Sequence, residues 1–193
     1  TIKHYVANNQ ETNRVTVDTK VSERALREIY LRGFEIAVKS SKPWSVMSSY
    51  NQVNGTTVSE HERLLIDVLR HEWGFDGVVM TDWFGGFDAV AQMKAGNELL
   101  MPGMPERTEA IRAALDCGDF DEAVLDRNVR FILDVVFRSL TANDHLRTDT
   151  PDLPANARHA RQAAADGVVL LKNASATLPM SPSARVAAFG TGS

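Results

Sequence analysis

An aspartate directly follows a short apolar run near the middle of the chain. The run Val78–Thr81 is preceded by Gly77 and leads into Asp82 and Trp83. Four such residues with turn signals on both sides are typical of a buried parallel strand. Asp82 would then stand at the carboxyl end of that strand, where loops of alternating strands and helices converge on one site. The alternative is that Asp82 caps the next helix, a role that Asp88 suits better.

Two other predicted strands also end in polar side chains. Lys3 and His4 close the first apolar segment, and Tyr50 with Asn51 follows the run Ser45–Ser49. These groups suit glycoside hydrolysis. A carboxylate can act as the nucleophile, a cation and a phenol can hydrogen-bond the sugar hydroxyls, and an indole offers a surface on which a sugar ring stacks. A solvated loop around the basic pair and a core position for the tyrosine remain open alternatives.

Metal-dependent hydrolysis is the competing use for such a carboxylate. It requires a cluster of His, Cys and carboxylate ligands, which the sequence lacks around Asp82. His61 and His71 lie in one predicted helix at a spacing that suits no metal pair on a single face, so we expect surface or packing positions. The closing G-T-G-S is too short for a phosphate loop. We therefore expect neither a metal nor a cofactor.

The amino-acid composition is typical of a globular protein. The 193 residues are 44% apolar and 24% charged, and the net charge of −4 gives no electrostatic case for nucleic acid or an anionic membrane. A neutral substrate is compatible with this balance. A single cysteine, Cys117, excludes an internal disulfide, and its place in a predicted helix favours a buried structural thiol. Neither a leader peptide nor a membrane-spanning run is visible.

Strand, loop and helix alternate along most of the chain. After the strand ending at His4, the pattern predicts helices over 22–40, 60–73 and 88–94, and strands over 45–49, 77–81 and 95–103. Ser59 and Glu62 have the spacing of a capping box for the second helix. This alternation indicates a parallel sheet with helices outside it, an α/β fold.

The last part of the chain differs in character. Two amphipathic helices are predicted over 105–117 and 121–140, followed by a polar, proline-containing linker over 141–156. A helix is predicted over 157–166, and strands are predicted over 167–173 and 186–190. They indicate a second domain, of which this sequence contains only the beginning. Both ends of the sequence look like interrupted strands, so we interpret the chain as an internal portion of a longer protein.

Five collinear segments carry a resemblance to glycoside hydrolase family 3, the β-glucosidase family. They are KHYVANNQETNR, SVMSSYNQVNG, GFDGVVMTDW, AGNELLMPG and ARQAAADGVVLLKN, and together they span essentially the whole chain. The resemblance implies that residues 1–140 are the later half of a (β/α)8 barrel, that 141–156 is a linker, and that 157–193 opens an α/β sandwich domain. A β-glucoside or oligosaccharide would be the substrate.

The resemblance also assigns roles to single residues. Asp82 matches the catalytic nucleophile of the family, and Trp83 would line the aglycone side. Lys3 and His4 would bond the sugar hydroxyls, and Tyr50 would stand beside the nucleophile. Glu11 and Arg14 match the Q-E-x-x-R part of the first segment and would support its loop through an ion pair.

The implied activity is retaining hydrolysis of terminal β-D-glucosyl residues, which needs a second carboxyl group as acid/base. In the family that glutamate is expected in the sandwich domain, beyond Ser193, and an Asp and an Arg from earlier barrel strands are also absent here. The hexosaminidase branch places a histidine after its Lys-His pair, whereas this chain has none until His61. The alternatives are a β-xylosidase, a phosphorylase or other family specificity, and a carbohydrate-binding relic without catalysis.

Overall fold

A computed structural model of the chain describes residues 1–139, 149–187 and 189–191. The chain divides into two compact units, residues 1–145 and 146–193, which are described separately. In the described part of the chain no helix is long and apolar enough to cross a membrane.

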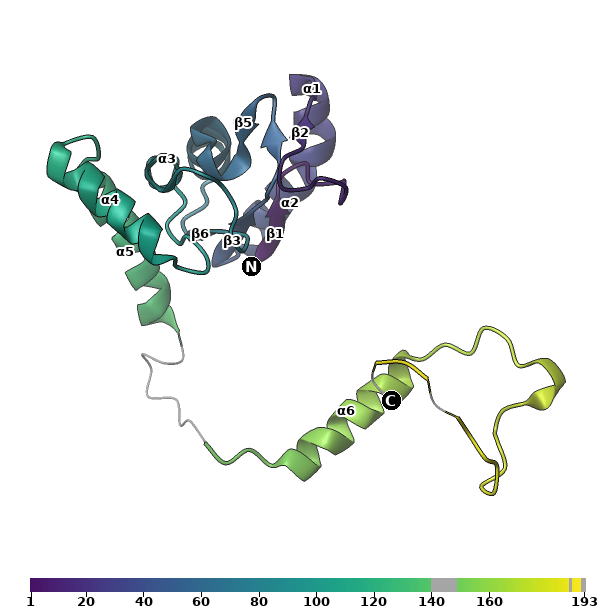
Figure 1. Cartoon of the computed structure of the whole chain (residues 1–193). Coiled ribbons are helices and arrows are strands. Elements are labelled where there is room, and N and C mark those ends of the chain that lie inside the picture. Colours follow the sequence, from purple (N-terminus) through teal and green to yellow (C-terminus); the bar gives the residue numbers. More distant parts are fainter. Residues whose placement is uncertain (140–148, 188, 192–193) are drawn as a thin grey trace. The chain divides into compact units, whose positions relative to one another are not determined.

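A parallel sheet lies at the centre of the first unit (Figure 1). Its strands β1 (Ile2–Tyr5), β3 (Ser45–Ser48) and β6 (Val78–Thr81) are hydrogen-bonded in that order, and Val46 pairs with Val79. A smaller sheet combines β2 (Asp18–Thr19), β4 (Gln52–Val53) and β5 (Thr56–Thr57). Parallel strands need long crossovers, and helices supply them here.

The first crossover is one nearly continuous helical segment. It comprises α1 (Glu23–Ala25), the π-helical turn η1 (Leu26–Tyr30) and α2 (Arg32–Ser41). The Ser22 hydroxyl caps it by accepting the N–H of Ala25 at 3.2 Å, as expected of serine at a helix start. The helix predicted over 22–40 is therefore confirmed.

The second crossover starts later than its sequence pattern indicates. Val58–Glu60 form the short 3-10 turn η2, and the helix η3 runs over Arg63–Glu72 instead of beginning near residue 60. The capping box was wrong. Ser59 is fully buried, and its hydroxyl has no hydrogen-bond partner among the described residues.

The hydrophobic core lies between the sheet and these helices. Tyr5 is completely buried, donates its hydroxyl to the carbonyl of Leu64 at 2.8 Å, and contacts Phe34 and Trp73 edge-on. Fully buried aliphatic side chains from β3, β6 and η3 complete it: Val46, Val79, Leu64, Leu65, Val68 and Leu69. Burial of about 25 cal/mol per Å² of apolar surface makes this cluster the main stabilising element of the unit.

Helices α3 (Ala89–Lys94), α4 (Pro105–Cys117) and α5 (Glu122–Arg138) follow β6, and α5 contacts that strand. All three were predicted. The predicted strand over 95–103 is largely wrong, because Leu99 makes only a single parallel bridge with Met80. Cys117 is exposed and not buried, since it is the last residue of α4 and that helix buries only Ala114.

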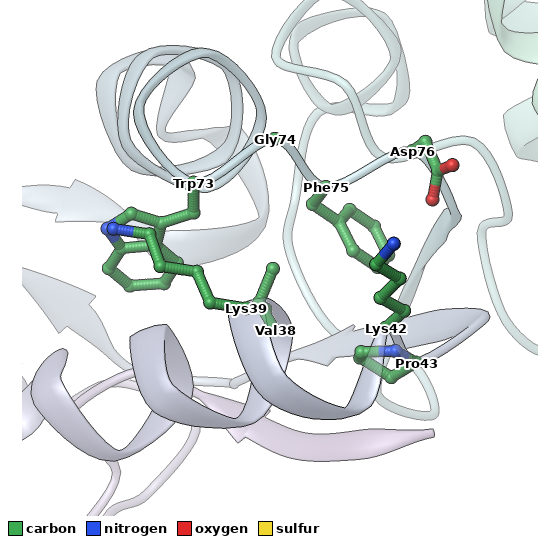
Figure 2. A pocket seen from close by; sticks show the side chains of 8 residues that line it. All are labelled: Val38, Lys39, Lys42, Pro43, Trp73, Gly74, Phe75 and Asp76. Carbon is green, nitrogen blue, oxygen red and sulfur yellow. The ribbon is translucent and has the colours of Figure 1, made fainter.

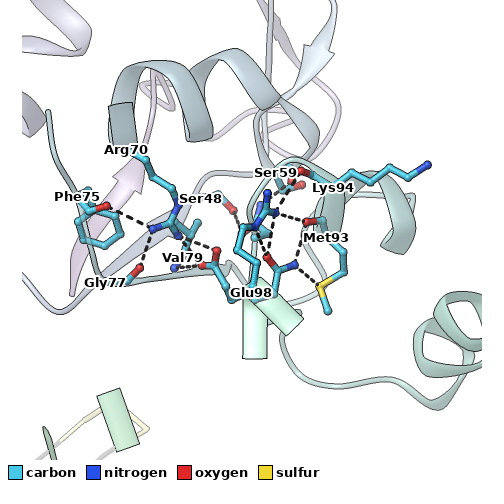
Figure 3. A network of polar contacts seen from close by, with 12 residues as sticks. Ser48, Ser59, Arg70, Phe75, Gly77, Val79, Met93, Lys94 and Glu98 are labelled. Atoms are coloured by element: carbon cyan, nitrogen blue, oxygen red, sulfur yellow. Dashed lines mark hydrogen bonds and ion pairs between the residues drawn. The ribbon is translucent and has the colours of Figure 1, made fainter. Parts of the chain in front are cut away.

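A buried ion pair joins η3 to the segment after α3 (Figure 3). Arg70 donates to both carboxylate oxygens of Glu98 at 2.7 and 2.8 Å, and Glu98 also accepts the backbone N–H of Val79 at 2.7 Å. Arg70 further donates to the carbonyl of Gly77 at 3.1 Å. Burial raises the pKa of Glu98 to about 7, although Arg70 and the Val79 N–H oppose this.

The second unit contains α6 (Leu153–Gly167) and the short turn η5 (Ala174–Ala176). The helix begins before the predicted residue 157, because Asp152 caps it and Pro154 fits the first turn, where no N–H is needed. The strands predicted over 167–173 and 186–190 are absent from the described residues there. A strand needs a partner, and the exposed run after Gly167 has none in this part of the chain.

Candidate active site

The carboxyl ends of β1, β3 and β6 lie at the same edge of the sheet, because the three strands are parallel. His4 lies near the end of β1, Tyr50 follows β3, and Asp82 follows β6 directly. Three segments that are distant in sequence therefore deliver an imidazole, a phenol and a carboxylate to one place.

Asp82 has one carboxylate oxygen held by backbone and one facing a side chain. Its Oδ1 accepts the N–H of Trp83 at 2.7 Å, while its Oδ2 lies 3.3 Å from Nε2 of His4. The Asp82 N–H donates to the carbonyl of Ser48 at 3.1 Å, which fixes the residue against β3. The side chain is 16% exposed, so a substrate can still reach the carboxylate.

Lys3 is exposed and lies next to His4 in β1. It makes no ion pair with Asp82 within the described part of the chain, and it borders an apolar groove that includes Ile29 and Phe34. The basic group in contact with the carboxylate is therefore His4. The role of Lys3 in binding sugar hydroxyls stays a prediction.

Tyr50 contacts both the loop after β1 and the loop after β6. Its hydroxyl donates to the carbonyl of Trp83 at 2.8 Å, and the Arg14 guanidinium lies over its ring at 5.0 Å from the centroid. Burial raises the pKa of the Tyr50 phenol, and the adjacent Asp82 carboxylate raises it further, although Arg14 opposes this. The phenol is thus held as a neutral hydrogen-bond donor beside the carboxylate.

Glu11 and Arg14 form an ion pair of 3.0 Å on the surface of the loop after β1. Both are exposed, so the pair contributes little to stability by itself. Because Arg14 also stacks on Tyr50, the loop is tied to the group beside Asp82. The ion pair is present, while the part that these residues play in a site stays a prediction.

Trp83 presents an exposed indole directly beside Asp82. The residue is 54% exposed, and Phe84, at 58%, contacts it edge-on with ring centroids 6.2 Å apart. Sequence reasoning did not single out Phe84, although a second aromatic residue next to the indole was visible. Each of these exposed rings offers a flat apolar face of the kind on which sugar rings and aromatic groups stack.

Arg107 and Glu60 were also missed. Arg107 donates to the carbonyls of Gly85 and Gly86, and Glu60 accepts backbone N–H groups of Phe87 and Asp88. All four hydrogen bonds join residues more than 20 positions apart in the sequence. No local pattern could have indicated them.

One well-formed cavity lies away from this edge (Figure 2). It is lined by the end of α2 and the segment before β6, including Lys42, Trp73 and Phe75. These residues precede β3 and β6, so the cavity belongs to the amino ends of the strands. Among the described residues, no group of three or more His, Cys, Asp or Glu side chains could hold a metal ion.

Comparison with known proteins decides the family. Residues 1–135 match the glycosyl hydrolase family 3 N-terminal domain. The chain belongs to glycoside hydrolase family 3. It is an α/β portion of that domain, and it spans about a quarter of the length of the curated relatives that it matches.

Relatives within this family are glycosidases of more than one specificity. Thermostable beta-glucosidase B of Acetivibrio thermocellus is 45% identical over 190 residues, which are 98% of this chain and 25% of that protein. An exo-alpha-(1->6)-L-arabinopyranosidase of Bifidobacterium longum is 44% identical over 181 residues, 93% of this chain and 23% of that enzyme.

A solved structure of the family is also similar to this chain. Beta-glucosidase 3B of Thermotoga neapolitana, in complex with glucose, matches with a TM-score of 0.77 and 55% identity. The match covers 93% of this chain and 26% of that one. The fold of this family 3 portion is therefore shared with a glucose-binding relative.

Proposed function

We propose that this chain carries the catalytic nucleophile of a retaining β-glucosidase. The observation that carries the proposal is the placement of Asp82, a carboxylate at a strand end with His4 in contact and an exposed Trp83 beside it. A nucleophile must be accessible, and it must be oriented by neighbours that leave one oxygen free to attack.

The reaction proceeds in two displacements. An Asp82 oxygen attacks the anomeric carbon, the glycosidic bond breaks, and its electron pair leaves with the aglycone oxygen, which takes a proton from a general acid. Water then attacks the same carbon after losing a proton to that residue, and the bond to Asp82 breaks. Two inversions return the original configuration of the sugar.

The neighbours of Asp82 would bind and orient the sugar. His4 and Lys3 would bond hydroxyls in the first subsite, and Tyr50 would stand beside the nucleophile as a neutral donor. Trp83 would receive the aglycone on its exposed face. Glu11 and Arg14 would support the loop, as their ion pair suggests.

We propose that the acid/base carboxyl group comes from outside this sequence. A retaining enzyme needs it about 5 Å from the nucleophile. We infer that residues 1–140 are the later half of a (β/α)8 barrel, that 141–156 link the domains, and that 157–193 open an α/β sandwich. Activity then requires the remaining segments, on the same chain or on a companion chain.

A different sugar specificity is the second candidate. The 44% identical relative named as an arabinopyranosidase favours it, because similar chains in this family act on different sugars. Analysis of the products from glucoside, xyloside and arabinopyranoside substrates, with and without phosphate, separates hydrolysis of each sugar from phosphorolysis.

The test is covalent trapping in the complete protein with a 2-deoxy-2-fluoro glucoside bearing an activated aryl leaving group. Such a leaving group departs with little acid assistance, so the reagent reports on the nucleophile. We expect peptide mapping by mass spectrometry to find the adduct on Asp82, and the Asp82→Asn variant to remain folded without turnover or adduct.

An exposed carboxylate of the same chain serves as the control. Asp88→Asn removes this negative charge, keeps a side-chain oxygen that can accept the N–H groups of Val90 and Ala91 at the start of α3, and leaves Asp82 in place, so labelling should persist. Near-normal activity of Asp82→Asn would overturn the assignment. Sugar binding with no adduct in the complete protein would indicate a carbohydrate-binding relic.

A further inference from the structure

The loop that leads from Asp82 to α3 is held in place by residues of other elements. Gly85 and Gly86 in this loop are buried and have no side chains of their own to anchor it. Their carbonyl oxygens both accept hydrogen bonds from Nη2 of Arg107, each at 3.1 Å. Arg107 lies in the first turn of α4, so the loop is tied to that helix.

Gln92 of α3 completes this attachment from inside. It is fully buried, donates Nε2 to the carbonyl of Gly85 at 3.1 Å, and accepts from Nη1 of Arg107 at 3.0 Å. Gly86 has φ of +72°, and a Cβ on it would lie 1.7 Å from Nε2 of Gln92. The backbone therefore approaches Gln92 so closely at this point that only glycine fits.

The two ends of the loop are fixed as well. Glu60 accepts the N–H of Phe87 at 2.7 Å and of Asp88 at 3.0 Å. At the other end, Gly85 donates to the carbonyl of Asp82 at 2.9 Å, and Phe84 donates to the carbonyl of Met101 at 3.0 Å. The backbone of the loop is thus bonded on both sides, while the rings of Trp83 and Phe84 are exposed to solvent.

We propose that Arg107 is a positioning residue that holds the Trp83–Phe84 ring pair in place to receive an aglycone, preferentially an aromatic or pyranose ring. The inference rests on the proposed function. The planar guanidinium of Arg107 donates to both carbonyls and to Gln92 at once, because its N–H groups form a rigid fork that spans all three acceptors. Lysine offers a compact charge and replaces this geometry only in part.

Loss of Arg107 leaves two carbonyls and Gln92 without their shared donor, so the loop can move. A displacement of about 1 Å in a binding group costs up to about 100-fold in rate. We expect the loss to fall on the aglycone side, because His4 comes from strand β1 and shares no hydrogen bond with Arg107 in the described structure.

The experiment compares Arg107→Met, Arg107→Lys and Arg112→Met in the complete enzyme. Arg112 lies on the same helix, and its side chain donates no hydrogen bond to the described residues, which makes it a matched control. The measurements are kcat and KM for an aryl and for a methyl β-glucoside, and the inhibition constant of free glucose.

For Arg107→Met we expect KM of the aryl glucoside to rise about 10-fold or more, and KM of the methyl glucoside to rise less. The inhibition constant of glucose should stay within about twofold, since glucose occupies only the first subsite. Arg107→Lys should recover part of the loss, and Arg112→Met should match the wild type.

Hydrogen exchange supplies a readout that does not depend on turnover. Arg107→Met should speed exchange of the amides of residues 83–88 and leave those of β3 unchanged. A lower melting temperature with unchanged KM values and unchanged loop exchange would overturn the inference, because Arg107 would then be merely structural. A wild type that hydrolyses no glucoside would contradict the proposed function, and loop exchange would still decide whether Arg107 holds the loop.

Discussion

At the scale of single residues, the environment of Tyr50 explains how a phenol can stay a donor beside a carboxylate. The negative charge of Asp82 disfavours a phenolate, and burial acts in the same direction and is the larger cause of the raised pKa. The hydroxyl group donates a hydrogen bond to the carbonyl of Trp83. Tyr50 therefore links the backbone of Trp83 to the neighbouring Asp82 carboxylate.

Titration of the phenol tests this link. Because the folded pKa of Tyr50 is raised, its contact with Trp83 persists below pH 10 and is lost only as the pH rises through the higher folded value. The ultraviolet difference titration between wild type and Tyr50→Phe should show one phenolate step above pH 10. Asp82→Asn should move that step toward 10 without reaching it, since burial remains. A difference step at or below pH 10 would contradict the account, provided that circular dichroism shows a folded protein.

At the scale of elements, the Arg70–Glu98 pair decides how η3 packs against the segment after α3. The Arg70 side chain is 8% exposed and that of Glu98 is completely buried. Arg70 also lies over the ring of Phe131 in α5, with 4.1 Å to the centroid. One guanidinium thus joins three elements beneath the candidate site, at the positions that Figure 3 shows for Arg70 and Glu98.

Removing one member of the pair should lower the free energy of unfolding, and the size of this decrease should depend on pH. Arg70→Met leaves Glu98 buried without its cation, which destabilises proteins by about 3 to 5 kcal/mol. The folded pKa of Glu98 then rises above its present value of about 7, so the contribution of Glu98 to stability is fully present below the unfolded value of 4.5 and is lost as pH rises through the folded value. Urea unfolding followed by tryptophan fluorescence should show a larger deficit at pH 8 than at pH 5.

The double variant Arg70→Met/Glu98→Leu is the control for this prediction. It removes both charges and fills the space with apolar groups, which often costs little for a buried pair. We expect it to recover most of the lost stability at pH 8. A deficit that is equal at both pH values, or that the double variant does not reduce, would argue against a charge-based role.

At the scale of the whole molecule, the two units differ in how much they bury. Every core residue belongs to the first unit, whereas no described residue of the second unit is buried. The apolar run Val168–Leu171 is exposed, with Leu171 at 93%. An isolated helix of 15 residues such as α6 is marginally stable in water. The second unit therefore needs partner segments for its stability.

Limited proteolysis of the isolated chain checks this difference. We expect the first cuts to fall within 149–187 and a product close to residues 1–139 to persist, as identified by mass spectrometry. The buried sheet strands β3 and β6 should stay uncut, because their backbone is hydrogen-bonded and covered. Equal protection of α6 and η3 would contradict this expectation. Early cleavage within β3 would do the same.

The helices of the first unit could be predicted because their signals are local. Ser22, Asp88 and Asp121 cap the helices that their sequence positions indicate, each by accepting nearby backbone N–H groups. The three strands of the central sheet were predicted from short apolar runs for the same reason. The capping box at Ser59 failed, since burial of that side chain in a 3-10 turn overrode its local preference.

For the candidate site, the sequence by itself determined which chemical groups stand at the strand ends: His4, Tyr50, Asp82 and Trp83. Only the tertiary structure decided that His4 is the group that touches the Asp82 carboxylate and that Arg107 anchors the glycine-containing loop. The physical reason is the sequence separation over which each kind of interaction acts. Caps and periodicity act between residues a few positions apart, whereas these contacts depend on the pairing of strands and the packing of helices that are far apart in the chain.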